Sequence, residues 1–270
     1  MLQHLRLPGN AYVWFISDLH LWQDRPSTFN QFEQVLHEAQ MQADALFILG
    51  DLFEYWAGDD DLESSAVAPV LKVLAAATNS GLPIYFQHGN RDFLFGVKAA
   101  EYTGLSLLAD ECVIELGQQR VLLMHGDTLC TDDLEYQQFR QQVRDPGWQA
   151  VFLSKPLNER HATIARLRAQ SEDRKARMAE SIMDVNPAAV QAVMQRHHVN
   201  TLVHGHTHRP ARHIQPDASI RWVLPDWEYD EMLTRGGVLT STDLFESNRI
   251  WFSPPVDSVG QGQSLHCYKR

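Results

Sequence analysis

Apolar runs alternate with amphipathic segments along the first part of the chain. Residues 11–21, 44–54 and 83–92 start apolar and turn polar at their ends, which is typical of a buried strand followed by a loop. Residues 29–40 and 65–81 repeat apolar side chains at helical spacing. Strands that alternate with helices predict an α/β fold with helices packed on both faces of the sheet structure. In such folds ligands collect at the strand ends, where the loops lie.

The later part of the chain predicts a hairpin, a long helical segment and a further strand. Residues 112–116 and 120–127 are strand-like and are joined by a short turn. The next strand with a polar exit is 200–206, and the roughly seventy residues before it have a helical pattern. We therefore expect one domain over 1–270, with a helical insertion at about 131–197.

Composition restricts the class of protein. The chain has 270 residues, of which 44% are hydrophobic and 21% charged, as in a soluble globular protein. Its net charge of −11 argues against nucleic acid as a partner. Cys112, Cys130 and Cys267 form no CxxC motif, which argues against a thiolate zinc site and fits a reducing compartment. With neither a secretory signal nor an apolar run of about 18 residues, we expect a cytoplasmic protein.

The helical insertion differs from the rest of the chain in charge. From Arg140 to Arg177 there are nine Lys or Arg and four Asp or Glu. Trp148, Phe152 and Leu167 are among the apolar residues between them. This mixture indicates a partner that is both anionic and apolar. Composition alone favours a plainer interpretation, a helical hairpin whose apolar face joins the core and whose arginines are solvated.

The predicted strands end in residue types that bind hard metal ions. In chain order these residues are Asp18, His20, Asp51, Asn90, His125 and the histidines at 204, 206 and 208. A lone aspartate after a strand is usually a helix cap, but five such strand ends in succession are not explained by independent caps. Carboxylate, imidazole and amide ligands without thiolate suit Mn²⁺, Fe or Zn²⁺. One carboxylate can bridge two ions about 3.5–4 Å apart, and Asp51 is the candidate bridge.

Three further residues near these strand ends are candidates for roles around the site. Glu54 and Asp127 are candidates to stand behind a ligand histidine and orient it, although Asp127 could equally cap the next segment. Trp56 suits either the hydrophobic core or an apolar part of the site.

The five blocks together resemble the calcineurin-like metallophosphoesterases. They are Asp-x-His (18–20), Gly-Asp (50–51), Gly-Asn (89–90), His-Gly-Asp (125–127) and Gly-His-Thr-His (205–208). The resemblance implies a four-layer αββα sandwich that carries two metal ions at its strand ends, with the insertion as a lid. It implies one ion on Asp18, His20, Asp51 and His208, and the other on Asp51, Asn90, His125 and His206. His204 is left over, and we expect it to pack behind the site.

The third block departs from the family pattern. Most members have histidine after Gly-Asn, and that histidine protonates the leaving group, whereas this chain has Arg91. Arginine cannot give up a proton near neutral pH, so Arg91 could not protonate an alkoxide leaving group. A phosphate that leaves from a pyrophosphate gains little from a general acid. Arg91 would then act as a fixed positive fork, and we expect it and Asp51 to be catalytic. The alternative is a structural salt bridge from Arg91 to Asp92 or another acid.

The wider sequence resembles one branch of that family, the UDP-2,3-diacylglucosamine pyrophosphohydrolases. The matching blocks are 48–61, 88–96, 122–133, 181–186 and 204–211. The resemblance implies hydrolysis of a lipid-linked UDP-sugar to UMP and lipid X in lipid A biosynthesis, by attack of water on the α-phosphorus, with two Mn²⁺ ions. It implies peripheral contact with the cytoplasmic face of the inner membrane, and no protein partner is inferred. A metallophosphoesterase acting on a soluble nucleotide, either a dinucleoside polyphosphate or a cyclic nucleotide, stays open as the alternative.

The same resemblance implies a set of substrate contacts. These contacts are Asn90, Arg91, Asp133, Ser171 and His206. Lys175 stands where relatives often have Asn, and Met178 where they often have Lys. We therefore expect Lys175 to bind the substrate in place of the missing charge.

Overall fold

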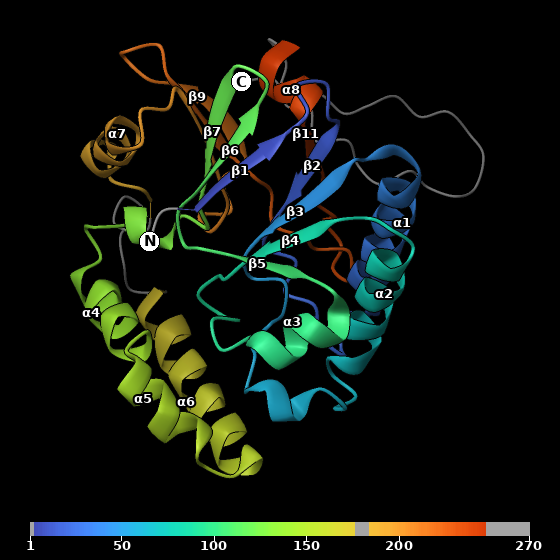
Figure 1. Cartoon of the computed structure of the whole chain (residues 1–270). Coiled ribbons are helices and arrows are strands. Elements are labelled where there is room, and N and C mark those ends of the chain that lie inside the picture. The colour runs from blue at the N-terminus through green and yellow to red at the C-terminus, as the bar shows by residue number, and fades with distance from the viewer. Residues whose placement is uncertain (1–2, 176–183, 247–270) are drawn as a thin grey trace.

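Two β-sheets lie face to face, with helices on the outside (Figure 1). The computed structural model describes residues 3–175 and 184–246. The five-stranded sheet has the order β11 (Leu239–Thr240), β2 (Val13–Ile16), β3 (Ala45–Leu49), β4 (Ile84–Gln87), β5 (Ser106–Leu108). The six-stranded sheet has the order β1 (Gln3–Leu7), β6 (Cys112–Leu116), β7 (Gln119–Leu123), β8 (Thr201–His204), β10 (Ile220–Val223), β9 (Ala211–Ile214).

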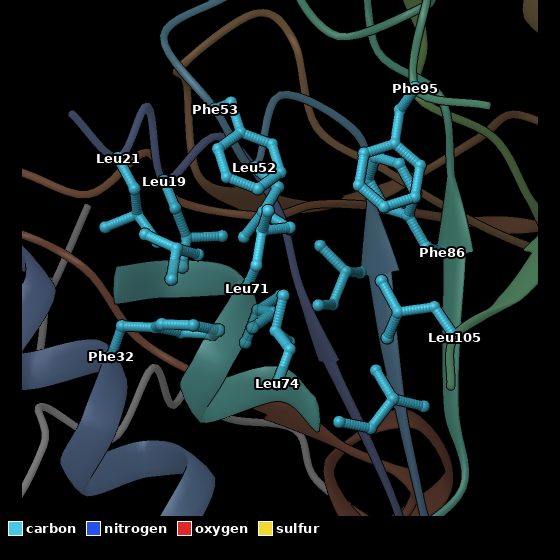
Figure 2. Packing of buried hydrophobic residues seen from close by; sticks show 14 of the residues in the cluster. Leu19, Leu21, Phe32, Leu52, Phe53, Leu71, Leu74, Phe86, Phe95 and Leu105 are labelled. Carbon is cyan, nitrogen blue, oxygen red and sulfur yellow. The ribbon is translucent and has the colours of Figure 1, made fainter. Parts of the chain in front are cut away.

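Helices cover the outer face of each sheet. Helices α1 (Pro26–Gln42), α2 (Ala68–Asn79) and α3 (Val97–Thr103) pack on the five-stranded sheet, where Leu71, Leu74 and Phe86 belong to one hydrophobic cluster (Figure 2). Helix α7 (Pro187–Arg196) packs on the six-stranded sheet through an apolar cluster of its own. The four-layer αββα architecture expected from the sequence is therefore confirmed.

The core between the sheets follows from the two-residue period of the strands. In β2, Val13 and Phe15 face the other sheet, whereas Trp14 and Ile16 face the helices. The ring of Phe15 stacks on Phe47 of β3, with centroids 5.4 Å apart. Because both faces of β2 and β3 are covered, their sequences are continuously apolar, which is the pattern that predicted them.

Most predicted elements are present, but several short strands, among them β1, were not expected. The predicted antiparallel hairpin is present as β6 and β7, although its second strand ends at Leu123 rather than continuing to 127. Strand β1 pairs in parallel with β6, although its half-exposed sequence carries little strand signal. Among the described residues, no helix is long and apolar enough to cross a membrane.

The segment between β7 and β8 is helical, but its helices do not form a single insertion, because the last of them belongs to the sandwich itself. Helices α4 (Leu134–Val143), α5 (Pro146–Leu153) and α6 (Leu157–Lys175) project together from one side (Figure 1). Buried Arg160 of α6 anchors this group by donating to the carbonyl oxygen of Ala57 at 2.6 Å and by contacting Asp60. In contrast, α7 belongs to the outer layer of the sandwich. The remaining short elements are η1 (Asp59–Asp61), η2 (Asp127–Leu129) and α8 (Ser241–Glu246).

Candidate metal site

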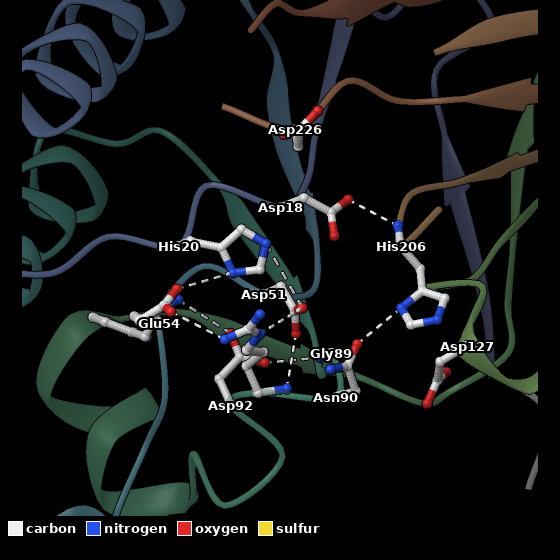
Figure 3. Close-up of polar contacts among 12 residues, drawn as sticks. Asp18, His20, Asp51, Glu54, Gly89, Asn90, Asp92, Asp127, His206 and Asp226 are labelled. Carbon is white, nitrogen blue, oxygen red and sulfur yellow. Dashed lines mark hydrogen bonds and ion pairs between the residues drawn. The ribbon is translucent and has the colours of Figure 1, made fainter. Parts of the chain in front are cut away.

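The candidate ligands converge at one edge of the sandwich. Asp18, Asp51, His125 and His206 each stand two residues beyond the end of a strand, namely β2, β3, β7 and β8. Asn90 follows β4 by three residues. Since β2, β3 and β4 are parallel neighbours, and so are β7 and β8, their carboxyl ends bring these side chains together (Figure 3).

The backbone at these positions is unusual. Five residues have φ between 49° and 67°, a left-handed conformation that side chains other than glycine rarely adopt: Asp18, His20, Asp51, His206 and His208. They are five of the seven described non-glycine residues with positive φ. Each such residue costs about 1–3 kcal/mol, and such strain concentrates at functional sites. The loops also require glycine, since a Cβ at Gly89 would overlap the Asp51 carboxylate and one at Gly205 the Asp18 carboxylate.

The ligand atoms form two adjoining groups. In one, Nε2 of His208 lies 3.5 Å from Oδ1 of Asp18 and 3.4 Å from Nε2 of His20. In the other, Nε2 of His125 and Nδ1 of His206 each lie 2.9 Å from Oδ1 of Asn90. Asp51 faces both groups, with Oδ2 at 4.0 Å from Nε2 of His20 and Oδ1 at 3.8 Å from Nε2 of His125.

The chemistry of these atoms fits divalent cations. Asp18 is fully buried, and its Oδ2 accepts hydrogen bonds from Ser17 and from the backbone of His206. Its Oδ1 accepts none from any described residue. In two groups of three residues, one ligand atom from each residue lies within 4.8 Å of the other two. These groups are Asp18, His20 and His208, and Asp18, Asp51 and His125. Carboxylate and imidazole atoms this close in a buried pocket form a suitable cradle for a metal ion.

The local electrostatics also favour bound positive charge. Burial, together with the carboxylates of Asp92 and Asp18, raises the pKa of Asp51 to about 7, against the opposing effect of His125. Burial lowers the pKa of His125, but Asp51, Asp18 and Asp127 outweigh it and raise that pKa to about 9. Both raised pKa values result from an excess of buried negative charge, which a divalent cation would neutralise.

An oxygen atom lies behind each of three candidate histidines. His125 donates from Nδ1 to the carbonyl oxygen of Leu49 at 2.9 Å. Nδ1 of His20 lies 3.5 Å from Oε2 of Glu54, and Nδ1 of His208 lies 3.4 Å from Oδ2 of Asp226. Metal-binding histidines are commonly oriented in this way.

The acceptor behind His208 was missed by sequence reasoning, whereas Glu54 was a candidate. Asp226 follows β10 directly after Leu224 and Pro225, which is the same strand-end position that marked the other residues. That position is the only sequence signal that could have suggested it. Arg235 fixes the Asp226 carboxylate by a hydrogen bond of 2.6 Å.

His204 and Asp127 have other tasks. Fully buried His204 donates from Nδ1 to the carbonyl oxygen of Gly205 at 2.8 Å and accepts from Arg221 at Nε2 at 3.0 Å. Burial and the Arg221 charge lower its pKa to about 3, so it is neutral and, as expected, packs behind the site. The Asp127 carboxylate accepts hydrogen bonds of 2.7 Å from Tyr136 and Arg140, and so links α4 to the site.

Arg91 lies beside the candidate ligands and forms a salt bridge. Its Nε lies 3.9 Å from Oδ2 of Asp51, and its Nη1 donates to Oε1 of Glu54 at 3.0 Å. The salt bridge to Asp92 considered from the sequence is therefore absent among the described contacts. Asp92 instead accepts hydrogen bonds from the backbone of Leu52 and Gly89. Glu54 also contacts Arg168 of α6, so this acid joins two arginines to the site.

A largely apolar cavity of about 360 Å³ adjoins the site. It begins at Asn90 and Arg91 and continues between the core and helices α4–α6, where Trp148, Phe152 and Leu167 line it. A further apolar hollow of about 270 Å³ shares the last three residues. Apolar cavities with a few polar groups at one end are typical of ligand sites.

The remaining predicted substrate contacts are placed unequally. Ser171 lines the apolar cavity, as does Trp56, which is also a core residue and so satisfies both of its interpretations. Asp133 begins α4 by accepting a hydrogen bond from the backbone of Tyr136 at 3.0 Å. The side chain of Lys175 and all of Met178 lie outside the described residues.

Comparison with known proteins identifies the family. Residues 11–210 match the calcineurin-like phosphoesterase family, and the chain belongs to it. It is 49% identical over 219 residues to the UDP-2,3-diacylglucosamine hydrolase of Aromatoleum aromaticum, covering 80% of this chain and 89% of that protein. It is 52% identical over 225 residues to the enzyme of the same name from Stenotrophomonas maltophilia, covering 79% and 90%. Among solved structures, the phosphoesterase Yfce from E. coli is similar with a TM-score of 0.40 and 18% identity, covering 80% of this chain and 79% of that one.

Proposed function

We propose that this protein hydrolyses the pyrophosphate bond of UDP-2,3-diacylglucosamine to UMP and 2,3-diacylglucosamine 1-phosphate, a step of lipid A biosynthesis. Relatives of that name match about four-fifths of the chain at close to 50% identity. The observation that carries the proposal is the apolar cavity that begins at Asn90 and Arg91, beside the candidate metal ligands. A substrate with an anionic pyrophosphate and two acyl chains requires both surroundings, whereas a soluble nucleotide gives the apolar cavity no role.

Two divalent cations would be held by the seven candidate ligands. One would lie on Asp18, His20, Asp51 and His208, and the other on Asp51, Asn90, His125 and His206. When bound, such ions supply positive charge to phosphoryl oxygens and lower the pKa of water toward neutrality. We propose Mn²⁺, because this set of oxygen and nitrogen donors without thiolate suits it.

The role of Arg91 follows from its fixed position. The Arg91 side chain is 22% exposed, and its guanidinium group is held by Glu54 and faces the Asp51 carboxylate. It can therefore bind a phosphoryl oxygen without having to be ordered first, which favours charge stabilisation in the transition state. No residue needs to protonate the leaving phosphate, which is a weak base.

We propose that the remaining substrate contacts come from the helical insertion, through Asp133, Ser171 and Lys175. Val151 is 65% exposed and Leu153 39% exposed on α5, close in sequence to Lys155. Exposed apolar and basic side chains together favour peripheral contact with an anionic lipid surface, here the cytoplasmic face of the inner membrane.

Incubation of the protein with UDP-2,3-diacylglucosamine and Mn²⁺ tests the proposal, with release of UMP as the signal. Asp51→Ala should abolish release while circular dichroism shows the fold retained. Hydrolysis of a dinucleoside polyphosphate or cyclic nucleotide, with no UMP from the lipid substrate, would overturn the proposed substrate. Near-normal UMP release by the variant would overturn the proposed site.

A further inference from the structure

A second, polar cavity of about 510 Å³ borders the candidate metal site. Its wall includes His20 and His208. It shares only Arg91 and Arg168 with the wall of the apolar cavity. The two cavities therefore meet at a pair of arginines beside the candidate ligands, and both have the size of ligand pockets.

The charges on this wall do not favour a second anion. Six carboxylates line it: Asp24, Glu54, Asp226, Glu228, Asp230 and Glu231. Each of its four arginines contacts one of them, since Arg25 binds Glu228, Arg235 binds Asp226, and Arg91 and Arg168 bind Glu54. The paired charges also make the cavity unsuitable for an acyl chain. Hydroxyl groups, which donate hydrogen bonds to carboxylates, suit it better.

The wall also has an aromatic side chain in a suitable place. Trp22 is half-buried and lies against Tyr55, with ring centroids 4.3 Å apart and planes tilted by 37°. Asp24 and Glu231 on the same wall are exposed. An indole ring with nearby carboxylates can hold a planar base and the hydroxyls of a sugar.

The geometry points to this polar cavity as the binding site for the nucleoside end of the substrate. The base lies against Trp22, and the ribose hydroxyls donate to Asp24 or Glu231. This inference rests on the proposed function: the pyrophosphate then lies where the cavities meet, beside Arg91 and Arg168. The acyl chains extend in the other direction, into the apolar cavity.

Saturation-transfer NMR with uridine tests the inference without substrate turnover, because uridine has no phosphate and needs no metal to bind. We expect transfer from the protein to the uracil protons, lost in Trp22→Ala and kept in Trp22→Phe. Inhibition by UMP should weaken about tenfold in Trp22→Ala, the effect of losing one base–aromatic stack. Trp148→Ala, in the apolar cavity, should keep the uridine signal and weaken inhibition by 2,3-diacylglucosamine 1-phosphate.

Three outcomes would overturn the inference: no transfer to uridine in the unmodified protein, equal transfer in Trp22→Ala, or loss of transfer in Trp148→Ala alone. The last would place the nucleoside in the apolar cavity. These outcomes are distinct from failure of the proposed function, in which the unmodified protein releases no UMP from UDP-2,3-diacylglucosamine.

Discussion

The Glu54 carboxylate connects the candidate metal site with helix α6, and removing its charge should reduce activity. Its Oε1 accepts from Arg91 at 3.0 Å and contacts Arg168, while its Oε2 lies 3.5 Å from Nδ1 of His20. Glu54→Gln keeps the size of the side chain. It removes the charge that holds both guanidinium groups and that orients the His20 ring.

The size of the effect can be estimated from these contacts. At 3.0 Å and an effective dielectric constant of about 20, the Glu54–Arg91 attraction is about 5.5 kcal/mol before the cost of desolvation. The two side chains are 19% and 22% exposed, so the guanidinium group recovers much of this by hydration when the partner is neutral. Losing the acceptor behind a ligand histidine typically costs about 10–100-fold. We therefore expect kcat/KM to fall roughly 30-fold, or about 2 kcal/mol.

UMP release and calorimetric titration with Mn²⁺ measure the two consequences separately. Glu111→Gln is the matched control, because Glu111 also accepts from an arginine and a histidine, Arg196 at 2.6 Å and His197 at 2.5 Å, but lines none of the cavities at the site. If Glu54→Gln loses no more activity and no more metal affinity than Glu111→Gln, the reasoning is refuted.

Four other perturbations have defined outcomes. His204→Gln should keep two ions per chain by elemental analysis, whereas His206→Gln should lose one, and equal losses would contradict the assignment of His204 as a packed residue. Asp226→Asn should weaken metal affinity about 10–100-fold, because the acceptor behind His208 loses its charge; an unchanged titration would argue against that role. Leu167→Trp should fill the apolar cavity and raise KM for the acylated substrate at unchanged metal content, and an unaltered KM would remove the acyl chains from this cavity. Burial raises the pKa of the Cys112 thiol to about 12, so at pH 8 it stays protonated, and mass spectrometry should find it alkylated by iodoacetamide only after unfolding; equal rates in the native protein would show that the thiol is accessible.

The local pattern of the chain was sufficient to predict an α/β fold and most of the candidate ligands, whereas the four-layer sandwich was expected only from the resemblance to a known family. The strand from Val13 to Ile16 is buried on both faces, so its sequence is continuously apolar and ends sharply at Asp18. The same change from apolar to polar marks Asp51 and His125. Parallel strands of one sheet end at one edge, so the five-stranded sheet alone brings Asp18 and Asp51 together. His125 follows a strand of the other sheet, and it meets them only because the two sheets pack face to face. Strand β1 was missed because a half-exposed edge strand has no comparable apolar run.

Contacts between segments distant in sequence were decided only by the tertiary structure. Asp226 stands behind His208 because β10 lies beside β8 in the six-stranded sheet, an order that no local pattern encodes. Glu54 binds Arg168 because α6 packs beside the loop after β3. His204, His206 and His208 are chemically identical in the sequence, and only their different surroundings separate a packed residue from two candidate ligands. Hydrophobic periodicity reports which face of an element is buried, but which side chains meet across that buried face depends on how the elements pack.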